Sequence, residues 1–175
     1  SVFLGGESGF EATTNVGSVF LGYQAGKNTK GDYHYNIAIG MQSLSSAHTG
    51  AGTIAIGYKS AEALTSGASN IAIGYQALKT HTTGHSNIAI GYDAMDDTDA
   101  GSTSLDSDHN LAIGVNAMGG TWANTKSEHN IAIGNNTLDA ALDGAYYNIA
   151  LGQYSLSNLT TGDTNIAIGW ASLEN

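Results

Sequence analysis

The chain has 175 residues and a formal net charge of −10, from 15 acidic and 5 basic residues, and it contains no proline and no cysteine. An acidic surface repels phosphate groups, so nucleic acid is excluded as an expected partner, and the lack of cysteine excludes disulfides and thiolate metal sites. No run approaches the roughly 18 consecutive apolar residues of a membrane helix, so we expect no membrane insertion.

A glycine-anchored unit repeats along the whole chain. The anchor glycine ends a short apolar segment such as residues 71–74 and recurs every 17 to 23 residues, at Gly5, Gly22, Gly40, Gly57, Gly74, Gly91, Gly114, Gly134, Gly152 and Gly169. Self-similarity at this period predicts one repeat domain over residues 1–175, built of about ten coils of 17–23 residues. The pattern is already running at residue 1 and stops within a unit, so we expect a fragment of a longer fibre.

The three residues before each anchor predict a β-strand. The first and third are large and apolar, mostly Ile, and the middle one is small, an alternation of period two. We expect the Ile face to be buried and the small column to face outward, at Ala38, Ala55, Ala72, Ala89, Ala112, Ala132, Ala150 and Ala167. So regular a column of small residues favours close approach of a second chain, and therefore a trimer interface. The alternative is a monomer that tolerates Ala on a flat face.

The residues after each anchor, for example residues 75–78, predict a second short strand, with a single helical turn as the alternative. The rest of each unit is rich in Thr, Ser, Gly and Asn, which is typical of turns. Such a coil cannot bury its own apolar face, so successive coils must stack and pair their strands in parallel about 4.8 Å apart. The sequence therefore predicts an all-β fold, a parallel β-solenoid of about ten coils.

An asparagine precedes most of the predicted strands, at Asn36, Asn70, Asn87, Asn110, Asn130, Asn148 and Asn165. Stacked Asn side chains can form hydrogen bonds from coil to coil and stabilise the turn before each strand. We expect this column to be structural, like the anchor glycines.

Units such as residues 70–78 (NIAIGYQAL) and 87–95 (NIAIGYDAM) resemble the head repeats of trimeric autotransporter adhesins, and also the repeat arrays of phage tail-fibre and related adhesin-like proteins. The resemblance covers essentially the whole chain. It implies a left-handed parallel β-roll, assembly into a homotrimer and attachment to host surfaces. The units here are longer than the adhesin-head coil, so the loops are longer.

Two groups of side chains could bind a metal ion. Asp97 and Asp99 lie in an acidic stretch that resembles part of a calcium loop, although the distal ligands are missing and a solvated insertion is the alternative. His81 and His85 could share a metal, but no third ligand lies nearby in the sequence. We expect no cofactor, with calcium as the possible exception.

Aromatic residues are the candidate binding groups. Tyr58, Tyr75 and Tyr92 follow successive anchors, Trp170 follows the last anchor, and Trp122 lies in a loop that interrupts the repeat. Aromatic side chains can stack on sugars or on receptor side chains, and a packing ladder is the alternative for the tyrosines.

The predicted function is a structural and adhesive segment of an extracellular homotrimeric fibre, on a cell surface or a virion appendage, with a host-surface glycan or protein as its partner. A passive shaft is one alternative. Another is a glycan-degrading tail spike, which would need paired carboxylates facing a groove. No Gly-x-Ser-x-Gly elbow, phosphate loop or His-Glu-x-x-His motif occurs, so we expect the chain not to be an enzyme.

Overall fold

The computed structural model describes residues 1–12, 14–30, 35–98, 106–122 and 125–174. These residues contain ten strands of three residues each, one per coil. The strands are β1 (Val2–Leu4), β2 (Val19–Leu21), β3 (Ile37–Ile39), β4 (Ile54–Ile56), β5 (Ile71–Ile73), β6 (Ile88–Ile90), β7 (Leu111–Ile113), β8 (Ile131–Ile133), β9 (Ile149–Leu151) and β10 (Ile166–Ile168). Within this part of the chain no helix is long and apolar enough to cross a membrane.

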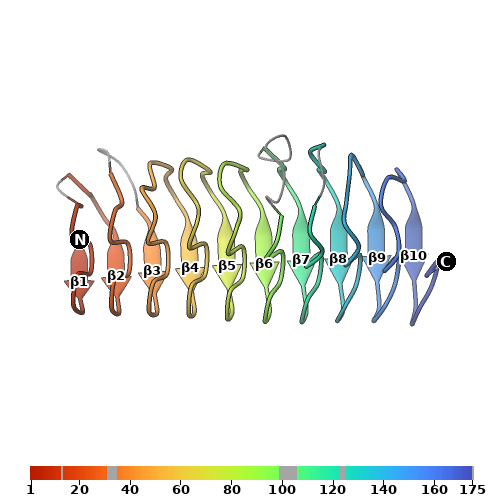
Figure 1. Cartoon of the computed structure of the whole chain (residues 1–175), viewed down its shortest axis with the longest axis horizontal. Helices are drawn as coiled ribbons and strands as arrows, with labels where there is room; N and C mark the ends of the chain where they lie inside the picture. Colours follow the sequence, from red (N-terminus) through yellow and green to blue (C-terminus); the bar gives the residue numbers. More distant parts are fainter. Residues whose placement is uncertain (13, 31–34, 99–105, 123–124, 175) are drawn as a thin grey trace.

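The ten strands form one parallel sheet in sequence order, with the two termini at opposite ends of a row of stacked coils (Figure 1). Neighbouring strands pair without a shift, so that Ile71, Ala72 and Ile73 lie beside Ile88, Ala89 and Ile90. The predicted all-β parallel solenoid is confirmed, and the strands lie at the three predicted positions of every unit.

The prediction for the two faces of the strands was wrong. The Ala column from Ala38 to Ala167 is buried inside the single chain, whereas the Ile residues on either side of it are partly or fully exposed. The Ala side chains therefore cannot form a trimer interface. The coil is so narrow that only a small side chain fits between the strand and the residues packed against it from the same coil.

The interior of the coil is completed by two columns that the sequence reading missed. Four residues after the anchor lies a buried apolar residue, as at Leu44, Leu78, Met95, Met118, Leu138 and Leu156. Seven or eight residues after the anchor lies a more varied column, with Thr29, His48, Leu64, His81, Thr98, Trp122 and Leu142, all fully buried. These side chains, rather than a second strand, supply the bulk of the core.

The segment after each anchor is a turn and not the predicted second strand or helical turn. Two residues in it have left-handed backbone, for example Gln76 with φ 56° and Leu78 with φ 52°. The backbone still bonds to both neighbouring coils, because Gln76 N donates to Tyr58 O at 2.9 Å and Leu78 N donates to Ala94 O at 3.0 Å. These intercoil bonds offset the roughly 1–2 kcal/mol that each left-handed residue costs.

The first two coils fill the interior differently. Phe3 and Phe20 replace Ala in the strand, and their rings stack with centroids 4.9 Å apart. In the same coils Gly9 and Gly26 replace the large residue four positions after the anchor. A Cβ atom added to Gly26 would lie 2.6 Å from the Phe20 ring, so the two positions exchange volume across the coil.

Candidate functional site

The sheet presents an exposed apolar strip along one side of the rod. It consists of the first and third residue of each of the ten strands, which are Val, Leu or Ile throughout. In the middle coils these side chains are half-buried, and at the two ends Val2, Leu4, Ile166 and Ile168 are largely exposed. A continuous apolar strip of this length is more than a monomer normally leaves in water, so it is a candidate interface.

The tyrosines that follow the anchors form a stacked ladder. The ring centroids of Tyr58 and Tyr75 are 5.0 Å apart, and so are those of Tyr75 and Tyr92, with the second pair nearly parallel at 4°. The rings cover one another's faces, so the ladder offers chiefly ring edges and hydroxyl groups to a partner. The Asp93 carboxylate beside it raises the pKa of Tyr92, because the negative charge opposes ionisation of the phenol.

The two tryptophans differ completely in exposure. Trp170 is 76% exposed and, like the tyrosines, directly follows an anchor glycine. Trp122 is 0% exposed, and its prediction as a partner-contacting residue was wrong. Its place eight residues after Gly114 puts it in the second core column, although the surrounding loop breaks the repeat.

Three carboxylates crowd the turn of the coil that follows β6. Burial, together with the charges of Asp93 and Asp97, raises the pKa of Asp96 to about 6. Asp97 accepts a hydrogen bond from the Thr121 hydroxyl, and Asp99 lies outside the described residues. In the described part of the chain no three His, Asp or Glu side chains are grouped to hold a metal ion, so the calcium prediction gains no geometric support.

Replacing Asp96 with asparagine should stabilise the chain at pH 7. Its folded-state pKa of about 6 lies above the ordinary 3.8, so the folded state loses stability as the pH rises from about 4 to about 6. A shift of two units corresponds to roughly 3 kcal/mol, and partial exposure to water reduces it, so we expect Asp96→Asn to gain about 1–2 kcal/mol. Urea denaturation at pH 7 measures the gain, which should vanish near pH 3.5. An equal gain at both pH values would contradict the assignment.

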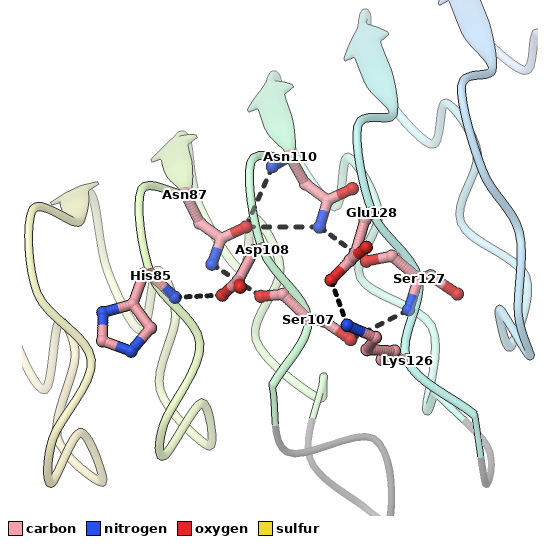
Figure 2. Close-up of polar contacts among 8 residues, drawn as sticks. All are labelled: His85, Asn87, Ser107, Asp108, Asn110, Lys126, Ser127 and Glu128. Carbon is pink, nitrogen blue, oxygen red and sulfur yellow. Dashed lines mark hydrogen bonds and ion pairs between the residues drawn. The ribbon is translucent and has the colours of Figure 1, made fainter.

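From Asn70 to Asn165 the asparagine column forms an unbroken ladder, buried up to Asn148, part of which is drawn in Figure 2. The side-chain oxygen of Asn87 accepts from Asn110 N at 2.9 Å, and that of Asn110 accepts from Asn130 N at 3.0 Å. From Asn70 to Asn148 each side-chain nitrogen donates to a backbone carbonyl one coil further along, as Asn110 does to Ser127 O at 2.8 Å. Every rung therefore joins two coils, which confirms the predicted structural role of the column.

A second polar column lies two residues before the asparagines. The Asp108 carboxylate accepts from His85 N, as Figure 2 shows, and the Asp163 carboxylate accepts from Tyr146 N at 2.8 Å. His85 performs the same task one coil earlier, because its Nδ1 accepts from Ala68 N at 3.0 Å. Two of the loop acids therefore bind backbone amides of the preceding coil, a role that the irregular loop sequences conceal.

The histidines do not form the metal pair considered from the sequence. Both ring nitrogens of the buried His81 are engaged within the protein, by Thr98 and by Asn87. His85 is exposed and uses one nitrogen for the bond to Ala68. The rings of His109 and His129 stack with centroids 4.9 Å apart on the surface, and Tyr147 continues the stack.

No protein-family model, no curated protein and no solved structure matches this chain.

Proposed function

We propose that the chain is a rigid segment of an extracellular homotrimeric fibre, on a cell surface or a virion, that takes part in attachment to a host surface. The observation that carries this proposal is the exposed apolar strip, which runs along all ten strands with one unchanged pattern. Identical rods that pack side by side in the same direction and in register bury this strip at every coil and can extend along the fibre axis without limit.

In the proposed three-fold arrangement the chains meet through the exposed apolar strip, and the buried Ala column takes no part in the interface. Three left-handed β-rolls around one axis would shield the first and third residue of each strand from water, which is the main source of affinity in permanent interfaces. An antiparallel dimer is the competing arrangement. It has an electrostatic advantage, because residues 1–80 carry four acidic and four basic residues whereas residues 81–175 carry eleven acidic and one basic.

The oligomer mass tests the proposal. Light scattering should give a mass near three times the 17.9 kDa chain. The double variant Ile73→Lys/Ile90→Lys places charges on the strip and should reduce the mass to one chain while the circular dichroism spectrum is retained. The control Tyr75→Lys/Tyr92→Lys puts the same charges on the tyrosine ladder, outside the strip, and should stay trimeric. A folded wild-type monomer or a dimer would reject the three-fold arrangement.

Attachment would use the aromatic groups that remain accessible on the outside of such a trimer. These are the edges of Tyr58, Tyr75 and Tyr92 and the exposed indole of Trp170. A glycan array and a host-cell binding assay with the trimer test this part, and Trp170→Ala should weaken binding if the indole stacks on the receptor. A trimer that binds nothing on either panel is a passive shaft.

The second candidate is a glycan hydrolase, and one observation favours it. A carboxyl group with a pKa of about 6 is suited to donate a proton to a leaving glycosidic oxygen, and Asp96 has this pKa beside two further carboxylates. Release of reducing sugar from host glycans, abolished by Asp96→Asn, would establish the activity. Unchanged release in that variant would remove Asp96 from the candidate acids.

A further inference from the structure

One titratable side chain contacts the asparagine ladder from within the core. His81 is fully buried in the second core column, where the preceding coil has Leu64 and the following coil has Thr98. The structural proposal for the fibre gives this imidazole no task, and an apolar residue serves at the same position in other coils. Its surroundings decide what it can do.

The tautomer of His81 is fixed by the asparagine ladder. The Asn87 side-chain oxygen accepts two hydrogen bonds from Asn110, from its backbone N at 2.9 Å and from its Nδ2 at 3.2 Å. The Asn87 amide is therefore oriented with its Nδ2, a donor only, 3.1 Å from His81 Nε2. Nε2 must accept, so the proton of the neutral ring is on Nδ1, which donates to Thr98 Oγ1 at 3.0 Å.

A second proton on this ring would face a donor of the ladder, although the backbone of Gly84 can form a hydrogen bond with the ring. A proton on Nε2 would point at the N–H group of Asn87, which cannot turn without losing its bonds to Asn110 and to the carbonyl of Ser107, 2.8 Å away. The space is also tight, since a Cβ atom on Gly84 would lie 2.3 Å from Nε2. Protonation of His81 is thus incompatible with an intact ladder at Asn87.

The electrostatic surroundings agree with the hydrogen-bond geometry. Burial lowers the pKa of His81 from 6.5 to about 4, and it outweighs the hydrogen bond to the Gly84 backbone, which favours the protonated ring. Of the charged side chains in the described residues, His85 disfavours the protonated ring and Asp106 favours it, and both effects are smaller than that of burial. In a coil that has opened to water, the ring would take up a proton near pH 6.5.

We propose that His81 makes the solenoid locally acid-sensitive: protonation of its Nε2 breaks the asparagine ladder at Asn87 and opens the coil around it, while distant coils stay folded. Stability here is lost as the pH falls from about 6.5 to about 4, because the open coil binds the proton more tightly than the closed one. The rod would then have a joint that weakens on acidification, independently of its oligomeric state.

Hydrogen–deuterium exchange on the full chain tests the joint, with labelling times corrected for the intrinsic pH dependence of exchange. Between pH 7 and pH 4.5 the two pKa values of His81 predict a rise of roughly 60-fold in the opening equilibrium of peptides covering residues 81–98, measured in the Asp96→Asn chain so that the opposing titration of Asp96 is absent. Peptides covering residues 131–156, which contain no histidine, serve as the reference and should show no such rise.

Two variants assign the effect to one ring. His81→Leu introduces the residue found at the equivalent place in the preceding coil, and it should abolish the rise in residues 81–98. In the same Asp96→Asn background, His85→Asn removes a nearby exposed imidazole and retains an acceptor for Ala68 N, so it should leave the rise unchanged. A rise that persists in His81→Leu, or one that is equal in all coils, would overturn the proposal.

A nitrogen NMR titration of the wild-type imidazoles decides the question even if His81→Leu does not fold. The ring of His81 should be the Nδ1–H tautomer at pH 7. It should take up the second proton, on Nε2, only as the amides of this coil lose their protection from hydrogen exchange. An Nε2–H tautomer, or titration near pH 6.5 in a chain that remains closed, would overturn the proposal.

Discussion

Gly91→Ala should prevent the solenoid from folding at 25 °C, whereas Gly169→Ala should leave it folded. Both glycines have a backbone that L-residues rarely adopt, with φ 143° and φ 125°. A Cβ atom on Gly91 would lie 2.1 Å from the carbonyl oxygen of Gly114 in the next coil, whereas one on Gly169 meets nothing within 4 Å. The first variant must separate two coils, and the second bears only the strain of about 1–3 kcal/mol expected for such a backbone.

Circular dichroism and urea denaturation of the two variants measure this difference. The pair separates two costs that are usually confounded, because the conformational strain is shared and only Gly91 adds the steric overlap. Equal losses of stability would show that the conformation alone demands glycine and that close stacking of the coils does not. The same comparison predicts that the anchors from Gly5 to Gly152 are all intolerant of Ala, since each approaches the backbone of the following coil.

The sequence was sufficient to predict the strands and the ladders. The anchor glycines and the asparagines recur at fixed offsets, and in a stacked fold identical offsets become identical positions in space. The structure accordingly pairs the strands without a shift and bonds Asn70 to Asn87 and Asn87 to Asn110. Periodicity was a reliable guide because each of these positions has the same surroundings in nearly every coil.

The direction of the strand faces could not be predicted from residue size. The alternation of Ile and Ala shows that the two faces differ, and in an ordinary sheet the larger residues lie in the interior. In a coil this narrow the interior takes Ala, and the Ile residues face out along the strip. In the second coil Phe20 and Gly26 take the places at which most other coils have Ala and a large residue. This exchange is the signal in the sequence that places both columns inside the coil.

The turn after each anchor and the burial of Trp122 were missed for a different reason. Gln76 and Leu78 have no intrinsic preference for left-handed backbone, and bonds to the two neighbouring coils impose it. The irregular sequence around Trp122 predicts an exposed loop residue, although the offset of Trp122 from Gly114 matches that of His48 from Gly40. In both cases the position of the residue in the stacked coil determines its backbone conformation or its burial, and local composition does not reveal that position.

The exchange of volume between Phe20 and Gly26 predicts a strong thermodynamic coupling. Gly26→Leu alone drives a side chain into the Phe20 ring, which would be 2.6 Å from the new Cβ atom, and we expect a loss of about 3 kcal/mol or more. Phe20→Ala alone leaves a cavity in the core and should cost about 3–5 kcal/mol. The double variant recreates the combination of Ala72 and Leu78, and Leu78 shows that a leucine fits at φ 52°.

We therefore expect the double variant Phe20→Ala/Gly26→Leu to be more stable than either single variant. Its remaining deficit should be about 1 kcal/mol, chiefly the stacking of Phe20 on Phe3. Urea denaturation of the wild type and the three variants gives the coupling energy, which should be at least about 5 kcal/mol and favourable. Additive losses would mean that the two positions do not share one space, and the Ala column would then need another reason for its small side chains. A favourable coupling would show that the coil has a fixed interior volume, which is why the bulky Ile residues must face outward.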